Sequence, residues 1–137
     1  MKNLFYIVIF ALCCTQLYAC EKRTETNIAK QDTMKLKITI NDKTANAILY
    51  DNPTSRDFVS MLPLTVQLDD YVNTEKVFTP SKKLTTKDAP KGFDPTVGDL
   101  TYYAPWGNIA LFYKDFGYAN GLISLGKITD GIEHFKV

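Results

Sequence analysis

Short runs in which every second residue is apolar dominate this chain from Met34 onward. Met34 to Ile40 reads MKLKITI, a period of two that indicates a strand with one buried face and one exposed face. The turn residues of Asn41 to Lys43 follow, and extended character returns over Thr44 to Tyr50, which predicts a β-hairpin. Strands alternating with helices would indicate a parallel sheet, but that order does not occur here. The chain is therefore restricted to mainly β folds.

The strongest strand signals lie further along. Val97 to Tyr103 and Ile109 to Tyr113 are nearly all apolar or aromatic, which predicts central strands covered on both faces. Weaker patterns predict three more strands, which span Leu64 to Leu68, Glu75 to Lys83 (an edge strand interrupted by Pro80) and Leu122 to Ile128. Turn and breaker residues predict a solvated turn at Asp69-Asp70, a loop over Thr85 to Thr96 and a loose end from Gly131.

One short helix interrupts the strands. Asn52 is a capping residue, Pro53 suits the first helical position, and Pro63 ends the pattern, so a helix of about nine or ten residues is expected. About seven short strands around one principal short α-helix predict a mainly β fold, a small closed β-barrel. We expect this domain to span residues 34–137.

Length and charge exclude several classes of protein. The chain has 137 residues, which suits a single folded domain. Its 23% charged and 45% apolar residues are ordinary for a globular protein and exclude wholesale disorder. Sixteen basic and 15 acidic residues are interspersed, so no basic block suits a row of phosphates. Nucleic acid is not an expected partner.

The N-terminus has the features of an export signal. Leu4 to Cys14 is an apolar run of 11 residues after a positive start, shorter than the about 20 residues that a spanning helix needs. Leu17 to Cys20 (LYAC) resembles the lipobox of bacterial lipoproteins. That resemblance implies a signal peptide over residues 1–19 and a diacylglycerol on Cys20. The alternative is an ordinary secretory signal with an incidental cysteine.

A polar tether is expected after the lipidated cysteine. Residues 20–33 contain one large apolar side chain, Ile28, and so have little to bury. Cleavage before Cys20 would remove the other two cysteines, which excludes a disulfide in the domain. With one histidine in the chain, neither a metal site nor a cofactor is expected.

A longer motif carries a second resemblance. Gly98 to Tyr113 (GDLTYYAPWGNIALFY) resembles the signature block of bacterial cyclophilin-like proteins. The helix from Asn52 to Phe58 and its exit over Leu62 to Leu64 also match that group. The resemblance implies a small barrel related in fold to the peptidyl-prolyl isomerases.

The catalytic arginine of the true isomerases has no counterpart in this chain. The corresponding region, Val77 to Lys83, contains no arginine. Beyond the signal segment the chain has only Arg23, in the tether, and Arg56, in the helix. A lysine does not replace a guanidinium that donates in a fixed fork. No catalytic residue is therefore assigned.

An aromatic cluster supplies the candidate binding residues. Trp106 lies in a connection between two strands, where a core residue is less expected, next to the amide of Asn108. Such an aromatic at a barrel mouth is suited to stacking on a ligand. The candidates for ligand binding are Trp106, Asn108, Tyr103, Phe112 and Arg56. The competing interpretation is that these aromatics fill the core and that Trp106 plugs the barrel end.

These features together predict a lipid-anchored protein of the bacterial cell envelope, on its periplasmic or outer-membrane face. Its cyclophilin-like domain is expected to act as a non-catalytic or accessory binding module for a peptide or small ligand. A divergent peptidyl-prolyl cis-trans isomerase is the alternative, on fold analogy. A purely structural envelope component is a third possibility. The sequence leaves the oligomeric state open.

Overall fold

The structure is a computed structural model that describes residues 33–136. The predicted signal peptide, the lipidation site Cys20 and the predicted tether up to residue 32 lie outside the described residues. No helix among residues 33–136 is both long and apolar enough to cross a membrane.

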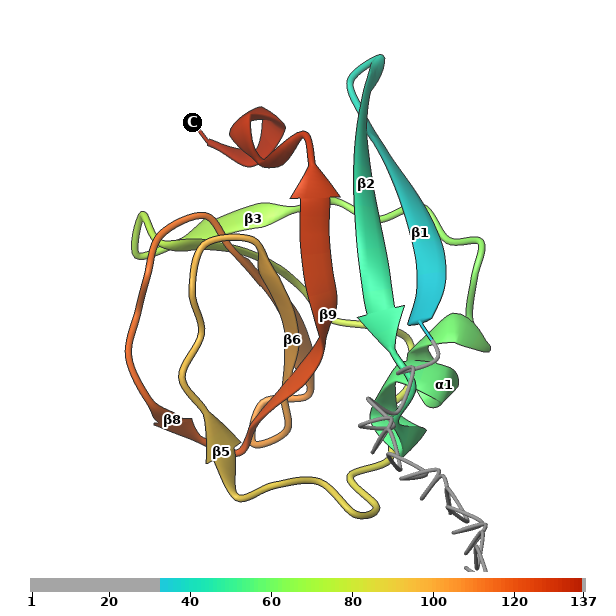
Figure 1. The fold of residues 1–137 in the computed structure, drawn as a ribbon, viewed down its shortest axis with the longest axis vertical. Helices are drawn as coiled ribbons and strands as arrows, with labels where there is room; N and C mark the ends of the chain where they lie inside the picture. Colours follow the sequence, from blue (N-terminus) through green and yellow to red (C-terminus); the bar gives the residue numbers. More distant parts are fainter. Residues whose placement is uncertain (1–32, 137) are drawn as a thin grey trace, which may run out of the picture.

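Antiparallel strands are the main regular structure of the described chain (Figure 1). The elements in order are β1 (Thr33–Ile40), β2 (Lys43–Tyr50), α1 (Pro53–Val59), β3 (Asp69–Tyr71), β4 (Glu75–Phe78), β5 (Gly92–Phe93), β6 (Asp99–Tyr103), β7 (Asn108–Phe112), β8 (Ala119–Asn120), β9 (Leu122–Asp130) and a 3-10 helix (Ile132–Phe135). Seven strands form one sheet in the order β1-β2-β9-β6-β7-β4-β3, and β5 pairs with β8 in a second, two-stranded sheet. The predicted hairpin and the central position of β6 and β7 are confirmed.

The long strand β9 joins the N-terminal hairpin to the centre of the sheet. Its first half pairs with β6 and its second half with β2. Each of the two pairings contains one irregularity at which the register shifts. Figure 1 shows β9 upright beside β2, bending toward β6 at its lower end. Gly126 lies where the two pairings overlap, opposite Leu49 on one side and Leu100 on the other.

Side chains alternate between the two faces of the central strands. Tyr102 on β6 and Ile109 and Leu111 on β7 belong to the main core, which also takes apolar residues of β2 and β9. The intervening residues Ala110 and Phe112 point to the opposite face and form a smaller cluster with Leu122. Both faces of β6 and β7 are therefore buried, as their apolar sequences predict.

The predicted closed barrel is wrong, because the sheet is open. In residues 33–136, β1 pairs only with β2, and β3 pairs only with β4. Closure requires every strand to find a partner on both edges. The predicted strand Leu64 to Leu68 forms no ladder, and the strand that follows it, β3, is three exposed residues long. Instead of closing the sheet, Leu64 and Leu68 pack their side chains against the main core.

The helix α1 is capped as the sequence predicts but is shorter. Asn52 accepts a hydrogen bond from the backbone N–H of Ser55 at 2.8 Å, and Pro53 occupies the first turn. The helix covers 7 residues rather than nine or ten, and a turn at Ser60 and Met61 precedes Pro63. Its polar side chains fix it to the sheet: Asn52 donates to the carbonyl oxygen of Ser124, and Ser55 donates to that of Leu125.

Two further expectations need correction. Asp69 and Asp70 lie in β3 rather than in a turn, and Asp70 accepts a hydrogen bond from the hydroxyl of Tyr113 at 2.5 Å. That hydrogen bond holds the pKa of Asp70 below its ordinary value. The segment after Gly131 is a 3-10 helix whose Phe135 is buried against the core, not a loose end.

Candidate ligand-binding groove

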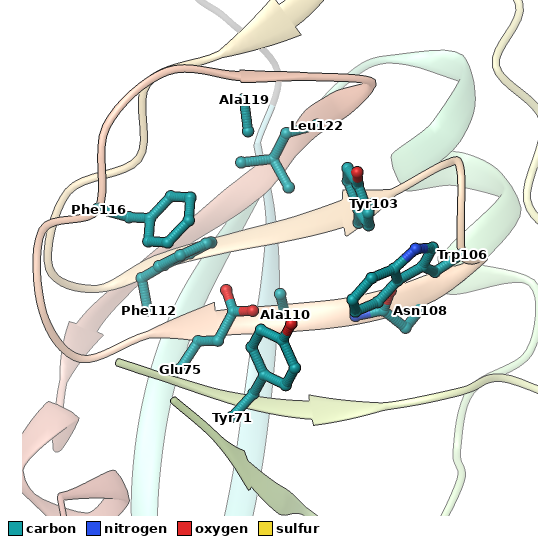
Figure 2. A pocket seen from close by; sticks show the side chains of 10 residues that line it. All are labelled: Tyr71, Glu75, Tyr103, Trp106, Asn108, Ala110, Phe112, Phe116, Ala119 and Leu122. Atoms are coloured by element: carbon teal, nitrogen blue, oxygen red, sulfur yellow. The ribbon is translucent and has the colours of Figure 1, made fainter. Parts of the chain in front are cut away.

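An open groove of about 210 Å³ lies on the face of the sheet opposite the main core (Figure 2). Its floor comes from alternate residues of β7 and its walls from β3, β4, β6 and the chain between β7 and β9. The lining residues are Tyr71, Glu75, Tyr103, Trp106, Asn108, Ala110, Phe112, Phe116, Ala119 and Leu122. Because successive side chains of β7 point to opposite faces of the sheet, one set is buried in the main core and the other set lines the groove.

The turn between β6 and β7 places Trp106 at one end of the groove. Gly107 has a φ of 75°, a left-handed conformation that glycine adopts without steric cost, and its N–H donates to the carbonyl oxygen of Tyr103. Trp106 is 62% exposed and therefore does not fill the core. Its ring meets those of Tyr71 and Tyr103 edge to face, with centroids 5.6 and 5.4 Å apart. These three residues form an aromatic corner.

Glu75 brings a carboxyl group into this apolar setting. In Figure 2 its side chain points from β4 toward the middle of the groove, between Phe112 and Tyr71. Burial raises the pKa of Glu75 from 4.5 to about 7. The neighbouring Lys76 faces the other way and pairs with Asp70 at 3.1 Å, so it does not neutralise Glu75.

Asn108 supplies a second polar group at the floor. The residue is buried, with 9% of its surface exposed, and its amide nitrogen makes one long hydrogen bond of 3.4 Å to the carbonyl oxygen of Ile109. Its amide oxygen Oδ1 is buried and has no hydrogen-bond partner within the described residues. Buried polar atoms are nearly always paired, so this oxygen indicates a place for a donor from outside the chain.

The groove therefore combines an apolar body with acceptor oxygens. None of its ten lining residues is a lysine, an arginine or a histidine. Among residues 33–136, no group of three or more His, Cys, Asp or Glu side chains could hold a metal ion. The arrangement is suited to non-covalent binding of a small or narrow ligand.

The structure brings together four of the five candidate residues from the sequence. Trp106, Asn108, Tyr103 and Phe112 all line the groove, but Arg56 does not. Arg56 lies on α1 and pairs with Asp51 at 2.6 Å, with more than half of its side chain exposed. It is the only arginine in the described part of the chain, so no guanidinium there enters the groove.

Sequence reasoning missed the residues that reach the groove from outside the signature block. Glu75 and Tyr71 are directly opposite each other on β4 and β3, and the ring of Phe116 lies tilted beside that of Phe112, with centroids 5.8 Å apart. The available signal for Glu75 was its place at the start of a predicted strand, where Lys76 and then two apolar residues follow it. Its position against β7 depends on a pairing that no local pattern specifies.

Comparisons with known proteins agree with the sequence motifs. The model of the cyclophilin-like family matches residues 38–137. No curated protein and no solved structure matches the chain significantly. The family match covers all of the described strands except residues 33–37 of β1 and includes every residue of the groove. The chain therefore belongs to the cyclophilin-like family.

Proposed function

We propose that this protein is a non-catalytic binding module whose groove takes a small ligand or one side chain of a peptide. The observation that carries the proposal is the exposed aromatic corner of Trp106, Tyr103 and Tyr71 beside the unpaired Oδ1 of Asn108. An open apolar pocket with a few convergent polar atoms is the usual form of a ligand site. A purely structural domain would gain stability by covering these rings and pairing this oxygen.

The arrangement of charges favours binding over isomerase chemistry. Rotation about an X-Pro bond crosses a barrier of about 18–20 kcal/mol, and a positioned guanidinium lowers it in the true isomerases. Here Arg56 lies on α1, pairs with Asp51 and does not line the groove. Apolar contacts that hold ground and transition states equally do not accelerate the reaction.

The binding proposal is tested by ligand-observed NMR with single-ring aromatic compounds and short proline-containing peptides. We expect saturable binding that Trp106→Ala weakens at least tenfold. Tyr118→Ala is the matched control, because Tyr118 is equally exposed, at 60%, but lies outside the groove. Equal loss in both variants would contradict the assignment of the groove.

A protease-coupled proline peptide assay tests the isomerase alternative. We expect a rate at background. A rate well above background that Arg56→Ala abolishes would replace the binding proposal with the isomerase.

We also propose that a lipid on Cys20 holds the domain at the bacterial cell envelope. The support is the sequence LYAC at residues 17–20, after an apolar run too short to span a membrane. Cys20→Ser should move the protein out of the membrane fraction or leave an uncleaved precursor. Cys14→Ser, a change in the apolar run, is the control and should fractionate like the wild type. Normal maturation of Cys20→Ser would contradict lipidation.

A further inference from the structure

We propose that the groove selects a compact organic cation, a protonated primary or secondary amine attached to a body about the size of one aromatic ring. The site is the groove described above, so this inference rests on the proposed binding function and specifies its ligand.

The polar atoms of the groove are acceptors that lack donors. The Glu75 carboxyl group has no salt-bridge or hydrogen-bond partner among the described residues. The Asn108 Oδ1 is buried and unpaired, while its amide nitrogen is already directed at a backbone carbonyl. A ligand that satisfies both oxygens must donate hydrogen bonds. An ammonium group offers up to three donors and a charge opposite to that of Glu75.

The aromatic corner is suited to the same charge. Trp106 meets Tyr71 and Tyr103 at interplanar angles of 85° and 76°, so the three rings present differently oriented π surfaces at one end of the groove. Cations are attracted to such surfaces, most strongly to tryptophan. A quaternary ammonium would use the rings but could not donate to Asn108 and Glu75. The unpaired oxygens therefore favour an amine that carries N–H groups.

The volume of the groove limits the body of the ligand. A cavity of about 150 Å³ lined by apolar side chains holds one benzene molecule. At about 210 Å³, the groove has room for one ring with a short chain. Phe112, Phe116 and Leu122 form the apolar end that would receive this body (Figure 2).

No side chain among residues 33–136 competes for the carboxylate of Glu75. The titratable groups that face Glu75 in the groove are the phenols of Tyr71 on β3 and Tyr103 on β6, and β7 contributes none. Lys76 and Asp70 lie on the opposite face and pair with each other. Lys114 and Lys76 both lie near the ring of Tyr113, outside the groove lining.

Binding of a cation should then depend on pH. Burial raises the pKa of Glu75 to about 7 in the free protein, so near neutral pH about half of the molecules carry a protonated carboxyl group. The cation binds the ionised form and lowers this pKa, so binding releases a proton below about pH 7. Because affinity scales with the competent fraction, Kd should be about tenfold higher at pH 6 than at pH 8.

The experiment uses the purified full-length chain and 2-phenylethylamine as the probe. Trp106 is the only tryptophan, so its fluorescence reports occupancy of the groove directly. The uncharged comparison compound is 2-phenylethanol, which has a similar shape. At pH 8 we expect a Kd for the amine at least tenfold below that for the alcohol.

Glu75→Gln keeps the shape of the side chain and removes its charge. We expect it to raise the Kd for the amine at least tenfold, to abolish the pH dependence and to leave the alcohol bound as before. Retained binding of the alcohol shows that the groove is intact in the variant. Glu133→Gln is the matched control, because Glu133 is exposed on the 3-10 helix and outside the groove.

Two results would overturn the inference. If the alcohol binds as tightly as the amine, or Glu75→Gln binds the amine like the wild type, the groove is a neutral apolar site and the proposed binding function survives. If neither compound changes the fluorescence of the wild type, selection of a cation is wrong. The NMR experiment with single-ring aromatic compounds and proline-containing peptides then decides the binding function separately.

Discussion

Glu75 and Asn108 reduce the stability of the fold that contains them. A buried amide oxygen without a partner costs about 1–3 kcal/mol of folding free energy. The half-buried carboxyl of Glu75 is held among aromatic side chains with no counter-charge in the groove. Packing alone does not explain why these two polar groups lie there without partners, whereas the proposed donor ligand would explain both.

The first prediction concerns Glu75 and pH. Because its pKa is raised to about 7 in the folded protein, the folded state binds a proton more tightly than the unfolded state. The unfolding free energy should therefore fall as pH rises from about 4.5 to about 7. Glu75→Gln should remove this slope, and above pH 7 it should be more stable by about 1 kcal/mol, a value discounted for the solvent screening of a half-exposed group.

Urea denaturation at pH 5 and pH 7.5 measures this difference. Asp57 and Asp70 do not contribute to it, because their pKa values are lowered by hydrogen bonds from Lys82 and Tyr113, and their effect is lost only in more acidic solution. Glu133→Gln should keep the wild-type slope. Superimposable profiles for Glu75→Gln and the wild type would contradict the assigned environment.

At the scale of elements, two contacts fix the N-terminal half to the central sheet. The first is the docking of α1 by Asn52, which caps the helix and donates to β9 at 3.0 Å. The second is the close approach of β9 to β2 at Gly126. A Cβ atom at residue 126 would overlap the carbonyl oxygen of Ile48 and the backbone of Leu49.

Asn52→Ala should lower the unfolding free energy by about 1–3 kcal/mol, because it removes the cap and leaves the partly buried carbonyl oxygen of Ser124 without its donor. Asn52→Asp keeps the acceptor for the N–H of Ser55 but not the donor to Ser124. Its unfolding free energy should therefore lie between those of the wild type and Asn52→Ala. Chemical denaturation measures both. Asn120→Ala, at an exposed position of β8, should change stability by less than about 0.5 kcal/mol. An Asn52→Ala variant as stable as this control would contradict the docking role.

Gly126→Ala should cost about 3 kcal/mol or more, because the backbone of β2 must move to admit the new atom. Gly117→Ala is the control that separates the cost of steric overlap from the cost of an unfavourable backbone conformation. Gly117 has a φ of 120° but open space around it, so that variant should lose about 1–2 kcal/mol from strain alone. Thermal and urea unfolding of both variants test whether Gly126→Ala loses more unfolding free energy than Gly117→Ala. A smaller loss for Gly126→Ala would mean that β9 and β2 are not in close contact.

At the scale of the whole molecule, one core supports the described domain without covalent or metal crosslinks. The three cysteines of the chain are Cys13, Cys14 and Cys20, all before residue 33. The main core takes residues from β1, β2, α1, β6, β7, β9 and the 3-10 helix, so elements from both ends of the domain share it.

We therefore expect a fragment of residues 33–137 to unfold in a single cooperative transition. Its melting temperature should be unchanged by a chelator or by a reductant, since neither has a site to act on. Differential scanning calorimetry with and without each reagent measures this. A fall of several degrees with the chelator would reveal a stabilising metal ion.

Local chemistry in the sequence determined the hairpin, the cap of α1 at Asn52 and the central pair β6 and β7. Turn residues, capping side chains and continuous apolar runs act over a few neighbouring residues, so their meaning does not depend on the rest of the fold. The same locality identified Trp106, because a tryptophan between proline and glycine in a short connection has few places to be buried.

Only the tertiary structure decided whether the sheet closes and what enters the groove. Leu64 to Leu68 alternates like a strand, but this segment pairs with no strand and its leucines pack against the main core. The strand β3 pairs only with β4, so it does not meet β1 at the other edge of the sheet. Glu75 became a groove residue through pairing with Tyr71 and Phe112, whereas the position of α1 leaves Arg56 outside the groove. Long-range strand pairing carries no local signature, and it is this pairing that places a carboxylate among aromatic rings.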